Sequence, residues 1–88
     1  MSFTLFVLPS TRRDLDGLDK AHYQRCYNGM TKLQKNPRVA GAKKLVGDDG
    51  YCLCVGEWQI LYRIDDAAKR VYIYRIKHRF LQQLPELR

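Results

Sequence analysis

Three segments rich in β-branched and aromatic residues follow one another with very short connections, and this arrangement limits the fold more than any other feature. The segments span 51–55, 58–64 and 71–77, and the connections are Gly56-Glu57 and the loop 65–69. Strands joined by so few residues must pair antiparallel, because a parallel crossover needs about a dozen residues or more. The sequence therefore predicts an antiparallel meander sheet.

The residues before the meander predict one further strand and a short helix. The run 3–8 is rich in β-forming residues and stops at Pro9. Thr11, with Asp14 three residues later, fits a capping box at the start of the helix, and Ser10 is a competing cap. The run 43–46, which lies between glycine turn signals, is either a short strand or an extended lead-in.

A longer helix is predicted between Asp19, a plausible N-cap, and Pro37, which ends it. Gly29 weakens such a helix by about 1 kcal/mol relative to alanine, so packing must compensate. The two helices are expected to form an antiparallel hairpin on one face of the sheet, which gives an α+β fold in one domain over residues 1–88. The apolar stripe of the longer helix is Tyr23, Cys26, Tyr27, Met30 and Leu33.

Alternation assigns the side chains of the three strands to two faces. One face is large and apolar and is expected to pack on the helices: Tyr51, Leu53, Val55, Trp58, Ile60, Tyr62, Ile64, Tyr72, Tyr74 and Ile76. The other is mixed and is expected to stay partly open: Cys52, Cys54, Gln59, Leu61, Arg63, Val71, Ile73, Arg75, Lys77 and Arg79. A solvated face is common in antiparallel sheets. The row of cations on the last strand, next to His78, also suits a phosphate backbone.

The charge balance favours an anionic partner. Sixteen Lys and Arg face nine Asp and Glu, which gives a net charge of +7 on 88 residues. Nucleic acid, the ribosome and an acidic protein would all suit such a surface. A charged face kept for solubility is the alternative interpretation.

The three cysteines, at positions 26, 52 and 54, fit neither a disulfide framework nor the ligand spacing of a zinc site. Free thiols are therefore expected, with Cys26 in the core. No apolar run approaches the length of a membrane span. We expect a cytoplasmic protein that needs no metal and no cofactor.

Short motifs along almost the whole chain occur in an order that a known family shares. They are Asn36-Pro37-Arg38, Gly41-Ala42-Lys43-Lys44-Leu45 with Gly47, Gly50-Tyr51, Val55-Gly56-Glu57, the run 60–66 and His78-Arg79. Each motif alone is weak, but the ordered set is specific. It resembles the RelE/ParE superfamily of toxins from type II toxin–antitoxin systems, and most closely the RelE-like mRNA interferases.

The resemblance implies a function as well as a fold. RelE-like members cut mRNA in the ribosomal A site, where the 2′-hydroxyl attacks the adjacent phosphate. That chemistry needs a base, an acid and cations for the developing charge. ParE-like members instead inhibit DNA gyrase, and a degenerate member would only bind its antitoxin or operator. The implied partners are a cognate acidic antitoxin, the ribosome and mRNA, with no membrane.

The resemblance and the predicted faces together single out candidate site residues. Histidine titrates near neutral pH, so His78 is the candidate acid or base, although it could simply cap a strand end. The catalytic candidates are His78, Arg79 and Arg63. The candidates for phosphate or RNA binding are Lys43, Lys44, Arg75 and Lys77, with a solvated loop as the alternative for the first two.

Three positions depart from the family pattern. Basic residues are usual in the family where this chain has Cys52 and Cys54, and arginine is usual where it has Gln59. Arg75 and Lys77 are expected to compensate for the lost charge. The two thiols are either activated by nearby cations or, as we favour, small fillers. Phe80 is the nearest candidate for the aromatic residue that often follows the His-Arg pair in the family.

Overall fold

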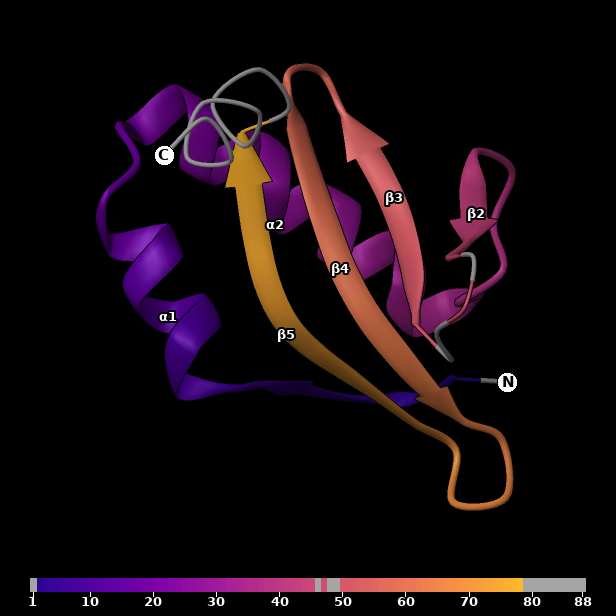
Figure 1. Ribbon diagram of the computed structural model, residues 1–88. Helices are drawn as coiled ribbons and strands as arrows, with labels where there is room; N and C mark the ends of the chain where they lie inside the picture. Colours follow the sequence, from indigo (N-terminus) through magenta and orange to yellow (C-terminus); the bar gives the residue numbers. More distant parts are fainter. Residues whose placement is uncertain (1, 46, 48–49, 79–88) are drawn as a thin grey trace.

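The computed structural model describes residues 2–45, 47 and 50–78 (Figure 1). Over these residues the chain forms five strands and two helices. In chain order they are β1 (Thr4–Val7), α1 (Pro9–Asp16), α2 (Lys20–Lys35), β2 (Ala42–Lys44), β3 (Tyr51–Val55), β4 (Trp58–Asp65) and β5 (Arg70–His78). Of the run 43–46, Lys43 and Lys44 belong to the short strand β2, and Val46 lies outside the described residues. Arg79, Phe80 and the rest of the C-terminal segment lie outside the described residues.

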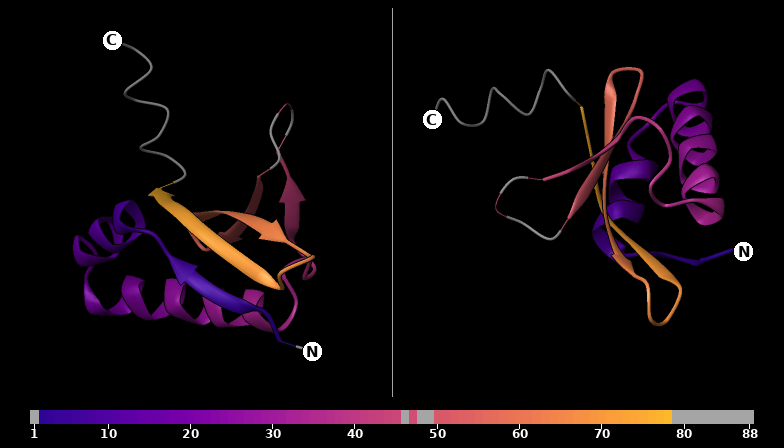
Figure 2. Two further views of the ribbon diagram at one scale, coloured as in Figure 1. Left: turned by 90° about the horizontal axis from the view of Figure 1, so that it is seen from below. Right: turned by 90° about the vertical axis from the view of Figure 1, so that its right-hand side faces the viewer.

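The strands form one mixed sheet in the order β1-β5-β4-β3-β2. β2 to β5 pair antiparallel with their neighbours, and β1 lies parallel to β5 at the sheet edge. Figure 2 shows both helices on the same side of the sheet. The predicted α+β fold, a strand and two helices followed by a meander, is therefore confirmed. We call the side that packs on α2 the helix face and the opposite side the open face.

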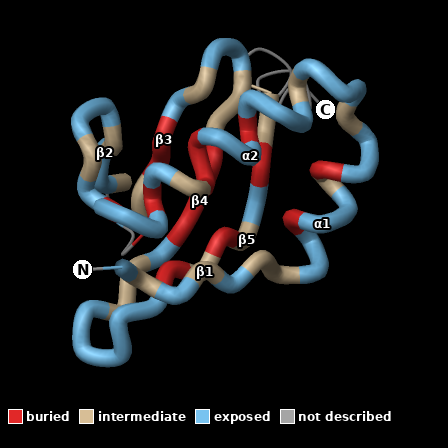
Figure 3. The backbone as a smooth tube through the Cα atoms, turned by 180° about the vertical axis from the view of Figure 1, so that it is seen from behind, coloured by how far each residue is buried: buried red, intermediate tan, exposed pale blue. Residues whose placement is uncertain are grey.

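The core lies between α2 and the centre of the sheet, where Figure 3 shows buried positions on α2, β3, β4 and β5. Tyr62 is fully buried there, and its hydroxyl donates a hydrogen bond to the carbonyl oxygen of Pro37 at 2.5 Å. Burial raises the pKa of Tyr62 to about 12, so the hydroxyl stays a donor at neutral pH. The bond ties the end of α2 to the middle of the sheet.

A β-bulge in β5 overturns part of the predicted face assignment. Alternation placed Tyr72 and Tyr74 in the core and Val71 and Ile73 on the open face. Val71 and Ile73 are instead fully buried, while both tyrosines are only partly buried. Leu61 pairs with Arg75 but Tyr62 pairs with Ile73, so Tyr74 is an extra residue in β5. One extra residue reverses the alternation on its N-terminal side.

The predicted capping box in α1 is also wrong. The helix begins at Pro9, and Leu8 at the N-cap offers no side-chain hydrogen bond. The hydroxyls of Ser10 and Thr11 donate instead to the carbonyl oxygens of Tyr74 and Ile73, at 2.6 and 2.8 Å. The Ile73 carbonyl oxygen also accepts a hydrogen bond from the Leu8 amide at 3.1 Å, and β1 does not pair with β5 beyond Ile73, so α1 continues the contacts along this edge of β5.

The first turn of α2 matches the prediction, but its apolar stripe is narrower than predicted. Asp19 caps the helix by accepting a hydrogen bond from the backbone amide of His22 at 2.9 Å. Cys26, Met30 and Leu33 are buried with Gly29. The outer members of the stripe, Tyr23 and Tyr27, are 42% and 49% exposed.

Gly29 lets α2 approach the sheet closely. A Cβ atom at this position would lie 2.8 Å from Cγ2 of Val55 and 3.0 Å from Cδ1 of Ile60. The distance to Val55 is shorter than carbon atoms tolerate and the distance to Ile60 is very tight, and Val55 has no flexible end that could move away. The close packing at Gly29 thus compensates for the low helix propensity of glycine.

We predict that Gly29→Ala lowers the free energy of unfolding by about 1 kcal/mol. Overpacking costs about 1–3 kcal/mol, and the better helix propensity of alanine returns only about 1 kcal/mol. Urea denaturation measures the change. Gly17→Ala is the matched control, because its Cβ would have no neighbour closer than 3.7 Å and its φ of −85° suits alanine. Equal effects from the two substitutions would contradict the close-packing account.

Candidate functional site

A row of cross-strand partners on the open face begins and ends with a cation. Lys43 pairs with Cys52, Cys52 with Leu61, and Leu61 with Arg75. Directly opposed residues share a face. Neighbouring strands lie about 4.8 Å apart, so the row spans about 14 Å from β2 to β5. The two cations flank a strip made of a thiol and a leucine.

The next row brings the remaining substituted positions together. Cys54 pairs with Gln59, and Gln59 pairs with Lys77. Cys52, Cys54 and Gln59 are therefore neighbours at the centre of the open face, with Lys77 beside them. The three positions at which the family usually carries basic residues form one cluster, and in this chain that cluster is neutral in residue type.

Arg75 and Arg63 each make a contact with another side chain of the protein. Nε of Arg75 lies 3.3 Å from a carboxylate oxygen of Asp14 in α1, and its side chain is half exposed. The same oxygen accepts a hydrogen bond from the backbone amide of Ile76 at 2.8 Å. Arg63 lies one row further along β4, with its guanidinium carbon 5.5 Å from the centre of the Tyr74 ring. Both arginines remain on the open face with Lys43 and Lys77.

The structure separates two candidates from this group. His78 pairs with Trp58, so it lies on the helix face, and its ring meets the Trp58 ring edge-on with centroids 4.8 Å apart. Its Nε2 lies 3.1 Å from a carboxylate oxygen of Glu57. Lys44 pairs with Tyr51, which places it on the helix face too. Arg79, the third catalytic candidate, lies outside the described residues.

Burial opposes activation of the Cys52 thiol. It raises the pKa of Cys52 to about 11, and the neighbouring Cys54 adds to the increase. Lys43 acts in the opposite direction, but its effect is the smallest of those that act on this thiol. Cys52 is therefore protonated at neutral pH and supplies neither a charge nor a nucleophile. This favours the interpretation of Cys52 as a small filler of the strip.

The sequence did not predict three aromatic side chains on the open face. Phe6 pairs with Tyr72, and their rings stack with centroids 5.2 Å apart. Tyr74 joins them through the bulge, under the guanidinium of Arg63. One available signal was the residue types in β5. Its β-branched valine and isoleucine suit a dry core, whereas tyrosine hydroxyls prefer a surface that water reaches.

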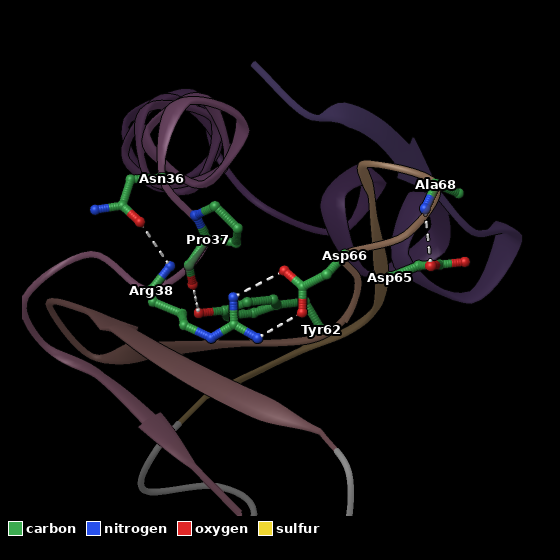
Figure 4. A network of polar contacts seen from close by, with 7 residues as sticks. All are labelled: Asn36, Pro37, Arg38, Tyr62, Asp65, Asp66 and Ala68. Carbon is green, nitrogen blue, oxygen red and sulfur yellow. Dashed lines mark hydrogen bonds and ion pairs between the residues drawn. The ribbon is translucent and has the colours of Figure 1, made fainter. Parts of the chain in front are cut away.

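A bidentate ion pair positions the segment that leads into β2. Both terminal nitrogens of Arg38 donate to the carboxylate of Asp66, at 3.0 and 2.9 Å (Figure 4). The backbone amide of Arg38 donates to the side chain of Asn36 at 3.1 Å. The hydrogen bonds from Arg38 lower the pKa of Asp66, so this carboxylate stays charged at neutral pH. The pair links the end of α2 to the β4–β5 hairpin.

A groove of about 370 Å³ lies between α2 and β3. β2 pairs with β3 only over Tyr51–Leu53, so within the described residues the edge of β3 that faces away from β4 has no neighbouring strand beyond Leu53. Cys54 at this edge is exposed. The groove is lined by Arg25, Asn28, Gly29 and Lys32 of α2, by the loop residues Val39, Ala40 and Gly41, and by Leu53, Cys54 and Val55.

Comparison with known proteins gives matches to solved structures. The toxin–antitoxin complex RelBE2 from Mycobacterium tuberculosis contains a chain with 27% identity and a TM-score of 0.81, covering 90% of this chain and 100% of that one. The RelE–RelB complex from Pyrococcus horikoshii gives 26% identity and a TM-score of 0.79, covering 90% and 97%. No family model and no curated protein matches the sequence.

The chain belongs to the RelE/ParE toxin superfamily. By structure it is a toxin of the RelBE type. A YoeB/ParE toxin from Agrobacterium tumefaciens shares the fold at 15% identity, with a TM-score of 0.74 and coverage of 86% of this chain and 98% of that one. The RelE/ParE fold therefore does not by itself choose between the activities that the superfamily contains.

Within this RelE/ParE fold, the described residues place no metal site beside the open face. No three His, Cys, Asp or Glu side chains among them gather closely enough to hold an ion. Neither described helix is long and apolar enough to cross a bilayer.

We predict that one of the three thiols reacts fast with Ellman's reagent in the folded protein at pH 8. Cys54 is exposed, whereas Cys26 and Cys52 are buried with pKa values raised to about 11. Cys54→Ser should remove the fast phase, and denaturation in urea should make all thiols react. Two fast thiols in the folded protein would show that Cys52 is activated, against the filler interpretation.

Proposed function

We propose that this toxin is a ribosome-dependent mRNA endonuclease whose activity is weakened by neutral residues at its centre. One observation carries the proposal. The open face of a RelE-type fold presents Lys43, Arg63, Arg75 and Lys77 around the cluster of Cys52, Cys54 and Gln59. A rigid sheet with cations on two sides of a small central strip suits a bound phosphodiester.

In the proposed reaction, the cations on both sides of the strip formed by Cys52 and Leu61 would act on the same phosphate. The 2′-hydroxyl of the message would lose its proton to water and attack the adjacent phosphate. The bond from phosphorus to the 5′-oxygen would break, and this oxygen would take up a proton from water, which leaves a cyclic phosphate and a free 5′-hydroxyl. The charge that develops on the phosphate would be stabilised by Arg75 and Lys77 on one side and Lys43 on the other. Cys52 is protonated and Gln59 is neutral, so the centre supplies no charge where the family usually does. The ribosome would position the message, which leaves the toxin to supply electrostatic stabilisation.

The same neutral cluster favours a second candidate function. A toxin that acts by binding DNA gyrase needs no cations at the centre of this face. Neutral residues at positions 52, 54 and 59 would therefore not impair its activity. A degenerate toxin that only binds its antitoxin is consistent with the cluster too. The cations that remain on the open face favour the nuclease over both alternatives.

The proposed protein partner is an acidic antitoxin. Solved neighbours include RelE-type toxins in complex with RelB antitoxins. In this chain the groove between α2 and β3 combines two cations, Arg25 and Lys32, with a strand edge that an extended segment could join. Hydrogen bonds along the edge would give affinity, and the cations would select an acidic segment.

Restoring charge at the central cluster tests the nuclease directly. We predict that Cys52→Lys, Cys54→Lys and Gln59→Arg together raise the rate of message cleavage in a cell-free translation reaction by about 100-fold or more, because a single electrostatic contact to a developing anion is worth that much. Primer extension on the message measures cleavage. Adding the same charge far away, with Tyr23→Lys, Gln24→Arg and Tyr27→Lys on α2, should leave the rate unchanged.

Removing charge supplies the converse experiment. Arg75→Ala with Lys77→Ala should abolish cleavage and leave the antitoxin bound, whereas Arg25→Ala with Lys32→Ala should weaken antitoxin binding and preserve cleavage. Both pairs remove two positive charges, so a nonspecific effect of net charge would act on both alike. If neither restoring nor removing charge on the open face changes cleavage, the nuclease proposal fails.

A further inference from the structure

A cluster of rings and arginines lies beside the proposed cleavage site and shares only Arg63 with it. We call it the stacking platform, and its members are Phe6, Tyr72, Tyr74, Arg63 and Arg70. The Phe6 and Tyr72 rings stack with their planes 26° apart. The guanidinium carbons of Arg70 and Arg63 each lie 5.5 Å from a ring centre, over Phe6 and Tyr74 respectively. Planar groups from β1, β4 and β5 thus lie together on one face.

Phe6 is the member whose exposure needs an explanation. It is 37% exposed on the edge strand β1, although its side chain has no polar atom that gains from water. Its neighbours fix its position, with Tyr72 against one side of the ring and Arg70 over it. An apolar ring held in place at the surface among cations is typical of a binding surface.

The net charge of the platform is positive. Arg63 and Arg70 contribute two positive charges, and Asp65, which pairs with Arg70 across the sheet and interacts with its charge, contributes one negative charge. The Asp65 carboxylate also accepts a hydrogen bond from the Ala68 amide at 3.1 Å. Arg70 itself donates to the Tyr72 hydroxyl at 3.3 Å. This hydrogen bond and the contact with Phe6 hold the guanidinium of Arg70 beside the rings.

We propose that the stacking platform binds unstacked bases of single-stranded RNA while the cations of the adjacent rows bind its phosphates. Aromatic rings and guanidinium planes accept any base by stacking, and the neighbouring cations track the backbone. An acidic protein segment would use the cations but would leave the ring faces unused. The identification of this RNA as messenger RNA rests on the proposed function.

The platform and the cleavage site are the right distance apart to engage one strand. Tyr72 and Lys77 pair with Arg63 and Gln59, which are four residues apart on β4, and this spacing corresponds to about 14 Å along the strand. The row of Arg75 lies between them. An RNA strand that runs along β5 would therefore stack on the platform on one side of the phosphate that is cut.

Fluorescence anisotropy with a labelled single-stranded 12-mer of 2′-O-methyl RNA tests the proposal. This probe cannot be cut by 2′-hydroxyl attack, so binding is measured apart from cleavage. We expect Phe6→Leu with Tyr72→Leu to lower affinity by about 10- to 100-fold, because stacking is worth about 1–3 kcal/mol per base. The salt dependence should stay unchanged, since no charge is removed. Tyr23→Leu with Tyr27→Leu, exposed tyrosines on α2, is the matched control and should bind as the wild type does.

Three outcomes would overturn the proposal. The first is wild-type affinity in the Phe6→Leu and Tyr72→Leu variant. The second is equal competition by inorganic polyphosphate, which would show that charge alone binds the probe. The third is a variant that keeps RNA binding but loses binding to polyglutamate, which would make the platform a protein-binding surface.

A second measurement covers the case in which the variant does not fold. RNA containing 4-thiouridine is irradiated with the wild-type protein, and mass spectrometry locates the crosslinks. Crosslinks at Phe6, Tyr72 or Tyr74 support the platform, and crosslinks confined to other elements contradict it.

Cleavage assays keep the two proposals distinct. A toxin that cuts no message but loses RNA affinity with the platform rings would contradict the proposed function and leave the platform intact.

Discussion

The extra residue in β5 determines which side chains reach the core and which reach the open face. Because Tyr74 is an extra residue in the register of β5 against β4, Val71 and Ile73 turn inward and Tyr72 turns outward. Hydroxyls of α1 bind the carbonyl oxygens on both sides of this point. Without the bulge, two tyrosines would enter a core shaped for β-branched residues, and the outer face would lose its aromatic groups.

The second constraint is that the helices stay on one side of the sheet. Gly29 brings α2 close against β3 and β4, while the Arg38–Asp66 pair and the Tyr62–Pro37 hydrogen bond connect the segment after the C-terminal end of α2 to the sheet. Polar and cationic side chains can then gather on the open face without being covered by α2. A rigid sheet is a good support for electrostatic chemistry, because its cations need little reorganisation when a phosphate arrives.

Much of this architecture follows from local sequence. Short connections imposed antiparallel pairing, Asp19 capped α2, and the ordered motifs indicated the RelE/ParE superfamily. The bulge was invisible because simple alternation carries no information about where a register shifts. The Thr11 cap failed for a similar reason, since its hydroxyl found a partner 62 residues away in β5. The positions of Lys44 and His78 on the helix face also depended on register, which only the assembled sheet defines.

The central claim is that the open face of this toxin acts on messenger RNA. It is tested most directly by inducing the chain in growing cells and sequencing the RNA ends that carry a 5′-hydroxyl group. The account predicts new ends inside translated coding regions, in phase with codons, and none in messages that are not being translated. Intact messages together with gyrase-dependent DNA breaks would contradict it.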